Sequence, residues 1–341
     1  MRSDNLSGVS EKVMQAIINE NNGLALAYSE DDVTAASQEN LRALFENKDL
    51  VSYNLVTGTA TNTLILATLC PTFGAIFCHE KSHIYADECG GVEFQTGGAK
   101  LHPISGKDGK MIPSAIEDAI GHYIIDEPHH SQPAIISIAN STEAGTIYSP
   151  DEVAAISEVA KKHNLKLHMD GARFANAVVA NGCSPADLTW KAGVDALSFG
   201  TTKNGTLGAE TAIFFNASDD KGFVYRRMRS GHLVSKSRYV SAQINAYIDD
   251  NHWLDNAKHA NDMADKLKGA ILNSSAIDLL YPMQTNILFV KMIPALNKAL
   301  EESGAVYYSW GVDDLVGARF VTAFNTPETD IERMIEVIGN F

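Results

Sequence analysis

The 341-residue chain is 45% hydrophobic and 20% charged, a balance typical of a folded globular protein and far from the polar bias of a disordered one. Its formal net charge of −15 argues against a nucleic-acid partner or an anionic-membrane surface, because both require a basic face. The polar N-terminus and the lack of a long apolar run predict neither a signal peptide nor a membrane span, and the four cysteines without a CxxC pair favour a reducing, cytoplasmic location.

A strand-like run over 51–56 leads into a turn of small residues, Thr57, Gly58 and Thr59, and then into an apolar helix over 63–69. Backbone N–H groups at such a helix start bind phosphate, and Gly58 permits close approach. An ordinary glycine turn with Thr59 as the helix cap is the alternative. The nucleotide signatures GxGxxG and the Walker lysine motif are absent from this turn, so a nucleotide site lacks its usual support.

Residues His79 to His83 match HExxH, the zinc metallopeptidase signature in which both histidines lie on one helix face. The match directly follows a strand-like run over 74–78, and residues 80–82 are typical of a loop. We therefore predict no metal site here and keep a zinc hydrolase as a distant alternative. The pair His129 and His130 is more typical of an exposed polar loop.

Short β-rich runs alternate with amphipathic helical stretches through the middle of the chain, which predicts an α/β fold with a mainly parallel sheet. Together with the first run, the expected strands cover 74–78, 134–139, 165–169, 194–199 and 211–215. Ser149 as cap, Pro150 in the first turn and Glu152 three residues after the serine predict that a helix begins at 150.

The C-terminal third has a different order of expected helices and strands. A long helix is expected over 239–269, followed by strands over 285–292 and 318–324 with a helix at 294–303 between them, and a closing helix over 329–339. We interpret this order as a smaller α+β domain. The sequence has no Gly/Ser linker, so the two parts are expected to pack together.

Asp170 stands at the carboxyl end of one expected strand, and Lys203 stands just after the next. In an open α/β sheet, ligands bind off the carboxyl ends of the strands, so both side chains would reach one crevice. A carboxylate beside a pyridine nitrogen and a lysine beside an aldehyde suit pyridoxal 5'-phosphate (PLP). Taken alone, the pair is more typical of a surface salt bridge.

Several motifs in the right order resemble the L-threonine aldolase family. They are Arg2 to Asn5, Thr57 to Thr59, His83 with Glu88 to Gly91, Asp170 to Arg173, and Gly200 to Gly205, the last similar to the FGxTKNG-like lysine segment of bacterial members. The resemblance spans nearly the whole chain and implies a fold type I PLP-dependent transferase-like fold. Its parts would be a mainly parallel seven-stranded sheet sandwiched by helices and a smaller C-terminal α+β domain.

The same resemblance implies three parts of the chain. Residues 1–30 would contribute to the active site, 31–245 would form the large PLP-binding domain, and 246–341 would form the small domain.

The resemblance also implies roles for the residues around the cofactor. Lys203 would form the imine with PLP, Asp170 would pair with the ring nitrogen, and Gly58 and Thr59 would hold the phosphate. His83 would stack on the ring and accept the β-hydroxyl proton, directly or through water.

Arg173 and Arg319, with Ser3, would bind the substrate carboxylate, because a guanidinium donates two parallel hydrogen bonds. Arg173 is also expected among the catalytic and cofactor-contacting residues. A solvated strand-end charge is the alternative for Arg319. Four further residues are expected near the substrate: Tyr28, Asp31, Glu88 and Glu143. Glu143 lies where the family often has a histidine, so either it replaces that group or it is structural.

In the resembled family a neighbouring subunit supplies basic groups to the phosphate. Here these would be Arg227 and Lys236 from the run 226–238, for which a solvated helix and loop face is the alternative. This arrangement implies a homo-oligomer with shared active sites, a dimer or a dimer of dimers, hence the expectation of a homotetramer.

The activity implied is that of an aldehyde-lyase, a low-specificity L-threonine aldolase. The enzyme would cleave the small amino acids L-threonine, L-allo-threonine and related β-hydroxy-α-amino acids to glycine and an aldehyde. Another PLP reaction on the same scaffold, β-elimination or transamination, is the alternative, and a catalytically silent binding protein is a third possibility.

Overall fold

The computed structural model describes residues 1–341 and contains two β-sheets. The larger sheet has the strand order β1-β7-β6-β5-β4-β2-β3. Its strands are β1 (Val51–Leu55), β2 (Gly74–His79), β3 (Lys100–Ile104), β4 (Gln132–Ala139), β5 (Lys166–Gly171), β6 (Ala196–Gly200) and β7 (Glu210–Phe214). Only β7 runs against its neighbours. The prediction of a mainly parallel seven-stranded sheet is confirmed.

Helices cover both faces of this sheet. Alternate strand residues point to opposite faces, so Phe77 joins the main core cluster while its neighbour Ile76 joins a separate cluster on the other side. On the main side lie α1 (Glu11–Asn19), α2 (Asp32–Leu44), α6 (Pro113–Ile120), α7 (Pro150–Lys162), α8 (Phe174–Asn181) and α10 (Arg238–Ile248). The other side carries α3 (Gly58–Leu69), α4 (His83–Ala86), α5 (Gly91–Thr96) and α9 (Phe223–Arg229). The sheet is therefore sandwiched by helices, as expected.

Local capping follows the sequence signals at α7 and departs from them at α3. Ser149 and Glu152 form the reciprocal capping box at the start of α7, which the sequence predicts. At α3 the side chain that accepts the N–H of Ala60 belongs to Thr57, so the alternative with Thr59 as the cap is wrong. Thr59 instead lies inside the first helical turn.

The expectation of one continuous helix over 239–269 is wrong. The chain forms α10, then a break, then α11 (His252–Leu272). Asp250 and Asn251 adopt left-handed backbone angles with φ of 53° and 57°, a conformation that Asp and Asn tolerate better than most residues. The break lets α10 pack on α1 and α2, while α11 packs on α8 and α13 (Glu328–Gly339). None of the helices combines the length and the apolar character needed to cross a membrane.

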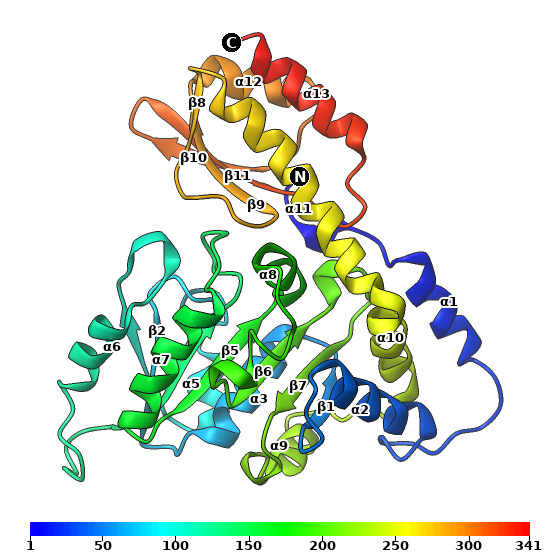
Figure 1. Cartoon of the computed structure of the whole chain (residues 1–341), viewed down its shortest axis with the longest axis vertical. Helices are drawn as coiled ribbons and strands as arrows, with labels where there is room; N and C mark the ends of the chain where they lie inside the picture. The colour runs from blue at the N-terminus through cyan, green and yellow to red at the C-terminus, as the bar shows by residue number, and fades with distance from the viewer.

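The second sheet is antiparallel and has the order β10-β11-β9-β8. Its strands are β8 (Ile277–Leu279), β9 (Ile287–Met292), β10 (Tyr308–Val312) and β11 (Leu315–Val321), and α12 (Pro294–Glu302) connects β9 to β10. With α11 and α13 this sheet encloses a separate hydrophobic core. Figure 1 shows this part, coloured yellow to red, above the large sheet, with the N-terminus at the junction.

Candidate active site

A cleft of about 520 Å³ opens where the two sheets and the N-terminal segment meet. Three parts of the chain that are far apart in sequence line it: Ser3 and Asn5; His83, Asp87, Glu143, Arg173 and Lys203; and Phe289, Tyr308, Trp310 and Arg319. A larger open groove of about 1050 Å³ lies elsewhere, between α2 and Trp190, and contains none of these residues. Six of the predicted site residues therefore gather at the smaller cleft: Ser3, His83, Glu143, Arg173, Lys203 and Arg319.

Asp170 and Lys203 share the inner end of this site. Their strands, β5 and β6, are parallel neighbours, and Asp170 stands opposite Ser198. A small inner cavity contains both residues. The Asp170 carboxylate accepts hydrogen bonds from the Ala172 N–H at 2.9 Å and from the Asn62 amide at 2.9 Å, which fix its orientation. The side chains do not form a salt bridge on the surface, so the alternative from sequence does not hold.

The turn before α3 offers free donors to the same inner cavity. Gly58 and Thr59 line it, and their backbone N–H groups have no partner within the protein. A Cβ atom added at Gly58 would meet nothing within 4 Å, so the missing side chain leaves room for a ligand beside these donors. Unpaired N–H groups at a helix start suit a phosphate. With a carboxylate and a lysine nearby, the residues fit PLP.

A chain of hydrogen bonds links His83 to Asp170. Nδ1 of His83 lies 2.8 Å from Oε1 of Glu88, and the Asn62 amide donates both to that oxygen and to Asp170. The hydrogen bond to Glu88 raises the pKa of His83 against the opposing effect of burial, and the charges of Asp170 and Glu143 raise it further. Glu88 is 5% exposed and burial raises the pKa of its carboxyl. The structure places Glu88 behind His83 and away from the open cleft.

The two arginines that were predicted to bind the substrate carboxylate, Arg173 and Arg319, differ in their hydrogen-bond partners within the chain. Asp4 binds Arg173 through two hydrogen bonds, from Nε at 2.7 Å and from a terminal nitrogen at 2.9 Å. Arg319 has a buried Nε without a partner and only a long contact of 3.5 Å from its terminal nitrogen to the Arg2 carbonyl. Burial, followed by the nearby charge of Arg173, lowers the pKa of Arg319. Arg319 is therefore the guanidinium in this cleft that is free to bind an anion.

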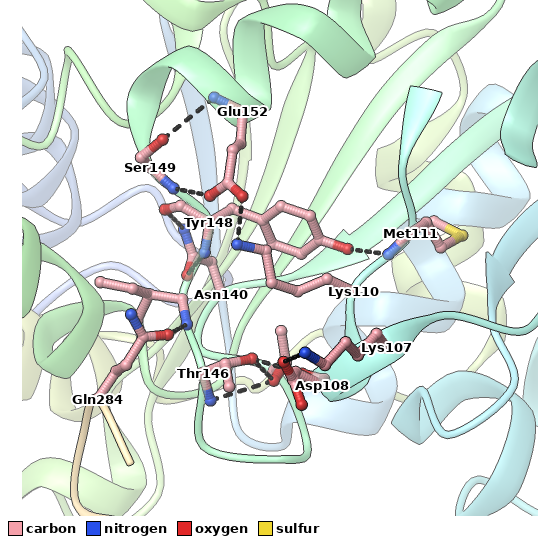
Figure 2. A network of polar contacts seen from close by, with 12 residues as sticks. Lys107, Asp108, Lys110, Met111, Asn140, Thr146, Tyr148, Ser149, Glu152 and Gln284 are labelled. Atoms are coloured by element: carbon pink, nitrogen blue, oxygen red, sulfur yellow. Dashed lines mark hydrogen bonds and ion pairs between the residues drawn. The ribbon is translucent and has the colours of Figure 1, made fainter. Parts of the chain in front are cut away.

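Glu143 reaches the cleft from a loop that is bonded to both domains. The Thr146 hydroxyl donates to the Asp108 carbonyl at 2.7 Å, and the Ile147 N–H donates to the Gln284 side chain at 3.0 Å. Figure 2 shows these contacts within a wider polar network around the loop. Burial raises the pKa of Glu143 and Asp170 adds to the effect, while Arg173, Lys203 and His83 oppose it. The loop thus places the Glu143 carboxyl, whose pKa is raised, in the same cleft as Arg173 and Arg319.

Four expected site residues lie away from both the cleft and its inner cavity within the chain. Asp31 is buried and caps α2, where it accepts the N–H of Thr34. Tyr28 lines a separate cavity of about 360 Å³ together with Arg227, whose guanidinium donates to the Asn54 carbonyl at 2.7 Å. Lys236 is exposed in the turn before α10. The structure of one chain does not bring these four residues to Lys203.

The residues that the sequence analysis missed come from two sources. Glu210 and Asn62 line the inner cavity, but Glu210 is a single charge at the start of a largely apolar strand and Asn62 lies among threonines, so neither forms a motif. Tyr308 and Trp310 line the cleft from β10, a strand that was not predicted because its side chains are mostly exposed and show no alternation. The only sign of these cleft residues in the sequence was that Tyr308 and Trp310 are aromatic and lie shortly before Arg319.

The helical arrangement that a zinc HExxH motif requires is not formed. His79 ends strand β2 and His83 begins α4, so the two rings do not share a helix face. His79 instead bonds to the Lys81 N–H and the Gly106 carbonyl. The prediction of a strand before the motif and a loop at residues 80–82 is confirmed.

The sheet, the small C-terminal domain and the cleft between them define a fold type I PLP-dependent enzyme. The family model described as beta-eliminating lyase matches residues 1–294. The chain belongs to this family of lyases. It is 38% identical to the low specificity L-threonine aldolase of a Pseudomonas species (strain NCIMB 10558), over 97% of this chain and 94% of the relative.

Solved structures agree with this assignment. The structure of Leishmania major threonine aldolase has a TM-score of 0.92 and 26% identity, covering 99% of this chain and 98% of that one. Oryza sativa TDC, solved with PLP and tryptamine, has a TM-score of 0.74 over 98% of this chain and 81% of that one, at 13% identity. The similarity to Oryza sativa TDC concerns the fold alone, because the identity is only 13%.

Proposed function

We propose that this chain is a PLP-dependent aldehyde-lyase that cleaves L-threonine, L-allo-threonine and related β-hydroxy-α-amino acids to glycine and an aldehyde. The observation that carries the proposal is that His83 and Lys203 line both the open cleft, which contains Arg319, and the inner cavity, which contains Asp170. The names of the Pseudomonas and Leishmania relatives support the same reaction. When bound, PLP supplies an aldehyde for a lysine and a ring that accepts the electrons of the bond being broken.

The chain's own residues would hold this group at four points. Lys203 would bind its aldehyde carbon, Asp170 would face its ring nitrogen, and the free N–H groups of Gly58 and Thr59 would bind its phosphate. His83 lines both the inner cavity and the open cleft, so it would lie between the cofactor and the substrate.

Substrate orientation would come from Arg319 and proton removal from His83. Arg319 would bind the carboxylate with Ser3, and this contact would turn the Cα–Cβ bond toward the position in which it breaks. Because Nδ1 of His83 bonds to Glu88, Nε2 is the ring nitrogen left to accept the β-hydroxyl proton, directly or through water. As that proton leaves, the β-carbon becomes the aldehyde carbon and the electron pair of the Cα–Cβ bond remains on the Cα side.

Product analysis with L-threonine tests the proposal. The purified, PLP-loaded chain should release glycine and acetaldehyde in equal amounts. Ammonia with a keto acid would instead indicate β-elimination, and a keto acid with an aminated cofactor would indicate transamination. Either result in place of glycine would overturn the proposal that the site catalyses aldol cleavage.

Replacement of Glu88 by glutamine should change the pH profile of the reaction. His83 must be uncharged to accept a proton, and its pKa is raised above 6.5, first by the hydrogen bond to Glu88. The acidic limb of kcat/KM for the parent enzyme should therefore lie above pH 6.5, and in Glu88→Gln it should move to lower pH. The measurement is kcat/KM for L-threonine over the stable pH range, with Glu158→Gln on the exposed face of α7 as the matched control. An unmoved limb would show that His83 does not accept the proton.

Replacement of Arg319 by glutamine should mainly weaken substrate binding. A charge-assisted hydrogen bond contributes about 1.5 to 3 kcal/mol, so KM for L-threonine should rise about tenfold to a hundredfold. The control is Arg333→Gln, which removes a half-exposed arginine of α13. An unchanged KM would favour the solvated strand-end alternative for Arg319.

The four residues that lie apart from Lys203 support a shared site in a homo-oligomer. Arg227 has a buried, unpartnered Nε beside the cavity that contains Tyr28. We assign Arg227 and Lys236 to the phosphate of a neighbouring subunit and Tyr28 to its substrate pocket, while Asp31, buried as the cap of α2, would hold the segment that carries Tyr28. A dimer, or a dimer of dimers, would complete each site.

A further inference from the structure

Glu210 is a buried carboxylate placed between the two loops that bear the cofactor-binding residues. It begins β7 and stands opposite Gly200 at the end of β6 and opposite Leu55 at the end of β1. Because β7 runs against its neighbours, its first residue lies at the edge where β6 leads to Lys203 and β1 leads to Gly58. Glu210 is 7% exposed and lines the inner cavity with Lys203.

Both oxygens of Glu210 bind the backbone just before Lys203. One accepts the Thr201 N–H at 3.2 Å and the other accepts the Thr202 N–H at 3.3 Å. The far side of the same loop is held by Asn204, which donates to the Tyr247 hydroxyl and the Trp253 carbonyl, each at 2.8 Å. The short segment that carries Lys203 is therefore held by hydrogen bonds on both sides of the lysine.

Few charges surround the Glu210 carboxylate. Lys203 faces it from the loop, and Tyr247 faces it from α10. The neighbouring residues of β1 and α3, Leu55 and Gly58, carry no charge. Burial raises the pKa of Glu210 to about 7, against the opposing effects of the Thr202 hydrogen bond and the Lys203 charge. A carboxyl that titrates near neutrality beside a single ammonium group is coupled to the proton on that ammonium.

We propose that Glu210 is a positioning residue for Lys203, fixing the Thr201–Thr202 backbone and balancing the charge of the lysine ammonium. When the amine gives up its positive charge to react, the adjacent carboxylate takes up a proton, so the buried pair does not keep an uncompensated negative charge. The inference deepens the proposed function, since it rests on Lys203 as the reactive amine. It is tested by the titration of that amine, which does not depend on which bond of the substrate breaks.

The direct test compares Glu210→Gln with the parent protein by trace acetylation. The full-length chain without cofactor is treated with acetic anhydride at a series of pH values, and acetylation of Lys203 is measured by mass spectrometry. Without the carboxylate the uncharged, nucleophilic amine is favoured, so Lys203 should react about tenfold faster at pH 7. Lys166, which pairs with Asp195 and Asp219, is the internal reference and should not change.

Two variants separate charge from shape. Glu158→Gln, on the exposed face of α7, should leave the Lys203 profile unchanged, and Glu210→Asp, which keeps the charge, should remain close to the parent. A role of Glu210 in folding alone would lower the unfolding temperature of Glu210→Gln without changing the Lys203 profile. A parent-like profile in folded Glu210→Gln overturns the proposal.

If Glu210→Gln does not fold, the reciprocal measurement decides. Coupling between two titrating groups is mutual, so Lys203→Met should raise the pKa of Glu210. Glu143 also faces Lys203, so Glu143→Gln is present in both proteins compared. The infrared C=O band of the protonated carboxyl should then persist to higher pH in the protein with Lys203→Met. An unchanged midpoint of this band would overturn the proposal independently of the first test.

Discussion

Replacement of Lys203 by alanine is expected to reduce the cleavage of L-threonine at least about a thousandfold, the scale on which loss of a covalent catalytic group is measured. Lys203 is the only amine in the cleft and in its inner cavity. The variant should still fold, because the hydrogen bonds that hold the loop come from Thr201, Thr202 and Asn204 and not from the lysine side chain.

Three measurements check this result. The rate of acetaldehyde release gives the loss of activity, visible absorption gives the cofactor content, and borohydride reduction followed by peptide mapping shows which lysine is linked to PLP. In the parent protein the label should lie on Lys203, and in Lys203→Ala it should be lost. Lys161→Ala, at an exposed position of α7, is the control and should behave as the parent. Labelling of another lysine in the parent protein would disprove the assignment.

Replacement of Asp170 by asparagine should lower kcat about a hundredfold to a thousandfold, the usual cost of removing one well-placed electrostatic contact. The substitution keeps the size of the side chain and removes its charge, so the ring nitrogen would no longer face a carboxylate. Unlike Lys203→Ala, this variant should still link PLP to Lys203, because β5 and β6 and the Lys203 loop are unchanged.

The two readouts separate the roles of the two residues. Asp170→Asn should give a normal borohydride label with low turnover, whereas Lys203→Ala should give neither. Asp187→Asn is the matched control, because Asp187 is a half-exposed partner of Lys191. Thermal unfolding of all variants checks that the fold is kept. Turnover of Asp170→Asn at the parent rate would mean that Asp170 does not face the cofactor ring.

Much of the fold can be predicted from local pattern. Six of the seven strands of the large sheet lie within a few residues of the apolar runs from which they were expected, whereas the edge strand β3, which is only partly buried, was not expected. The Ser149 cap signals the start of α7 because capping is a contact between near neighbours in sequence. The signal fails where local preference is weak, as at Asp250 and Asn251, where tertiary packing divides one helical stretch into two.

The exposed strand β10 shows the second limit. Its residues, Tyr308 to Val312, lack alternation between buried and exposed positions because the strand lies at the edge of the small sheet. Only pairing with β11 makes it a strand, and pairing is a long-range property that a local pattern does not contain. Tyr308 and Trp310 were missed as cleft residues for this reason.

The sequence by itself determined where the residues proposed to carry the chemistry lie, since Asp170, Lys203 and the turn at Gly58 each follow an apolar strand whose end must lie at the ligand edge of a parallel sheet. The tertiary structure alone decided their partners. It pairs Arg173 with Asp4 and leaves Arg319 free, and it brings Glu210 against the backbone before Lys203. Such pairings depend on how distant segments pack, because two side chains that bond across a core carry no mark of each other in the sequence.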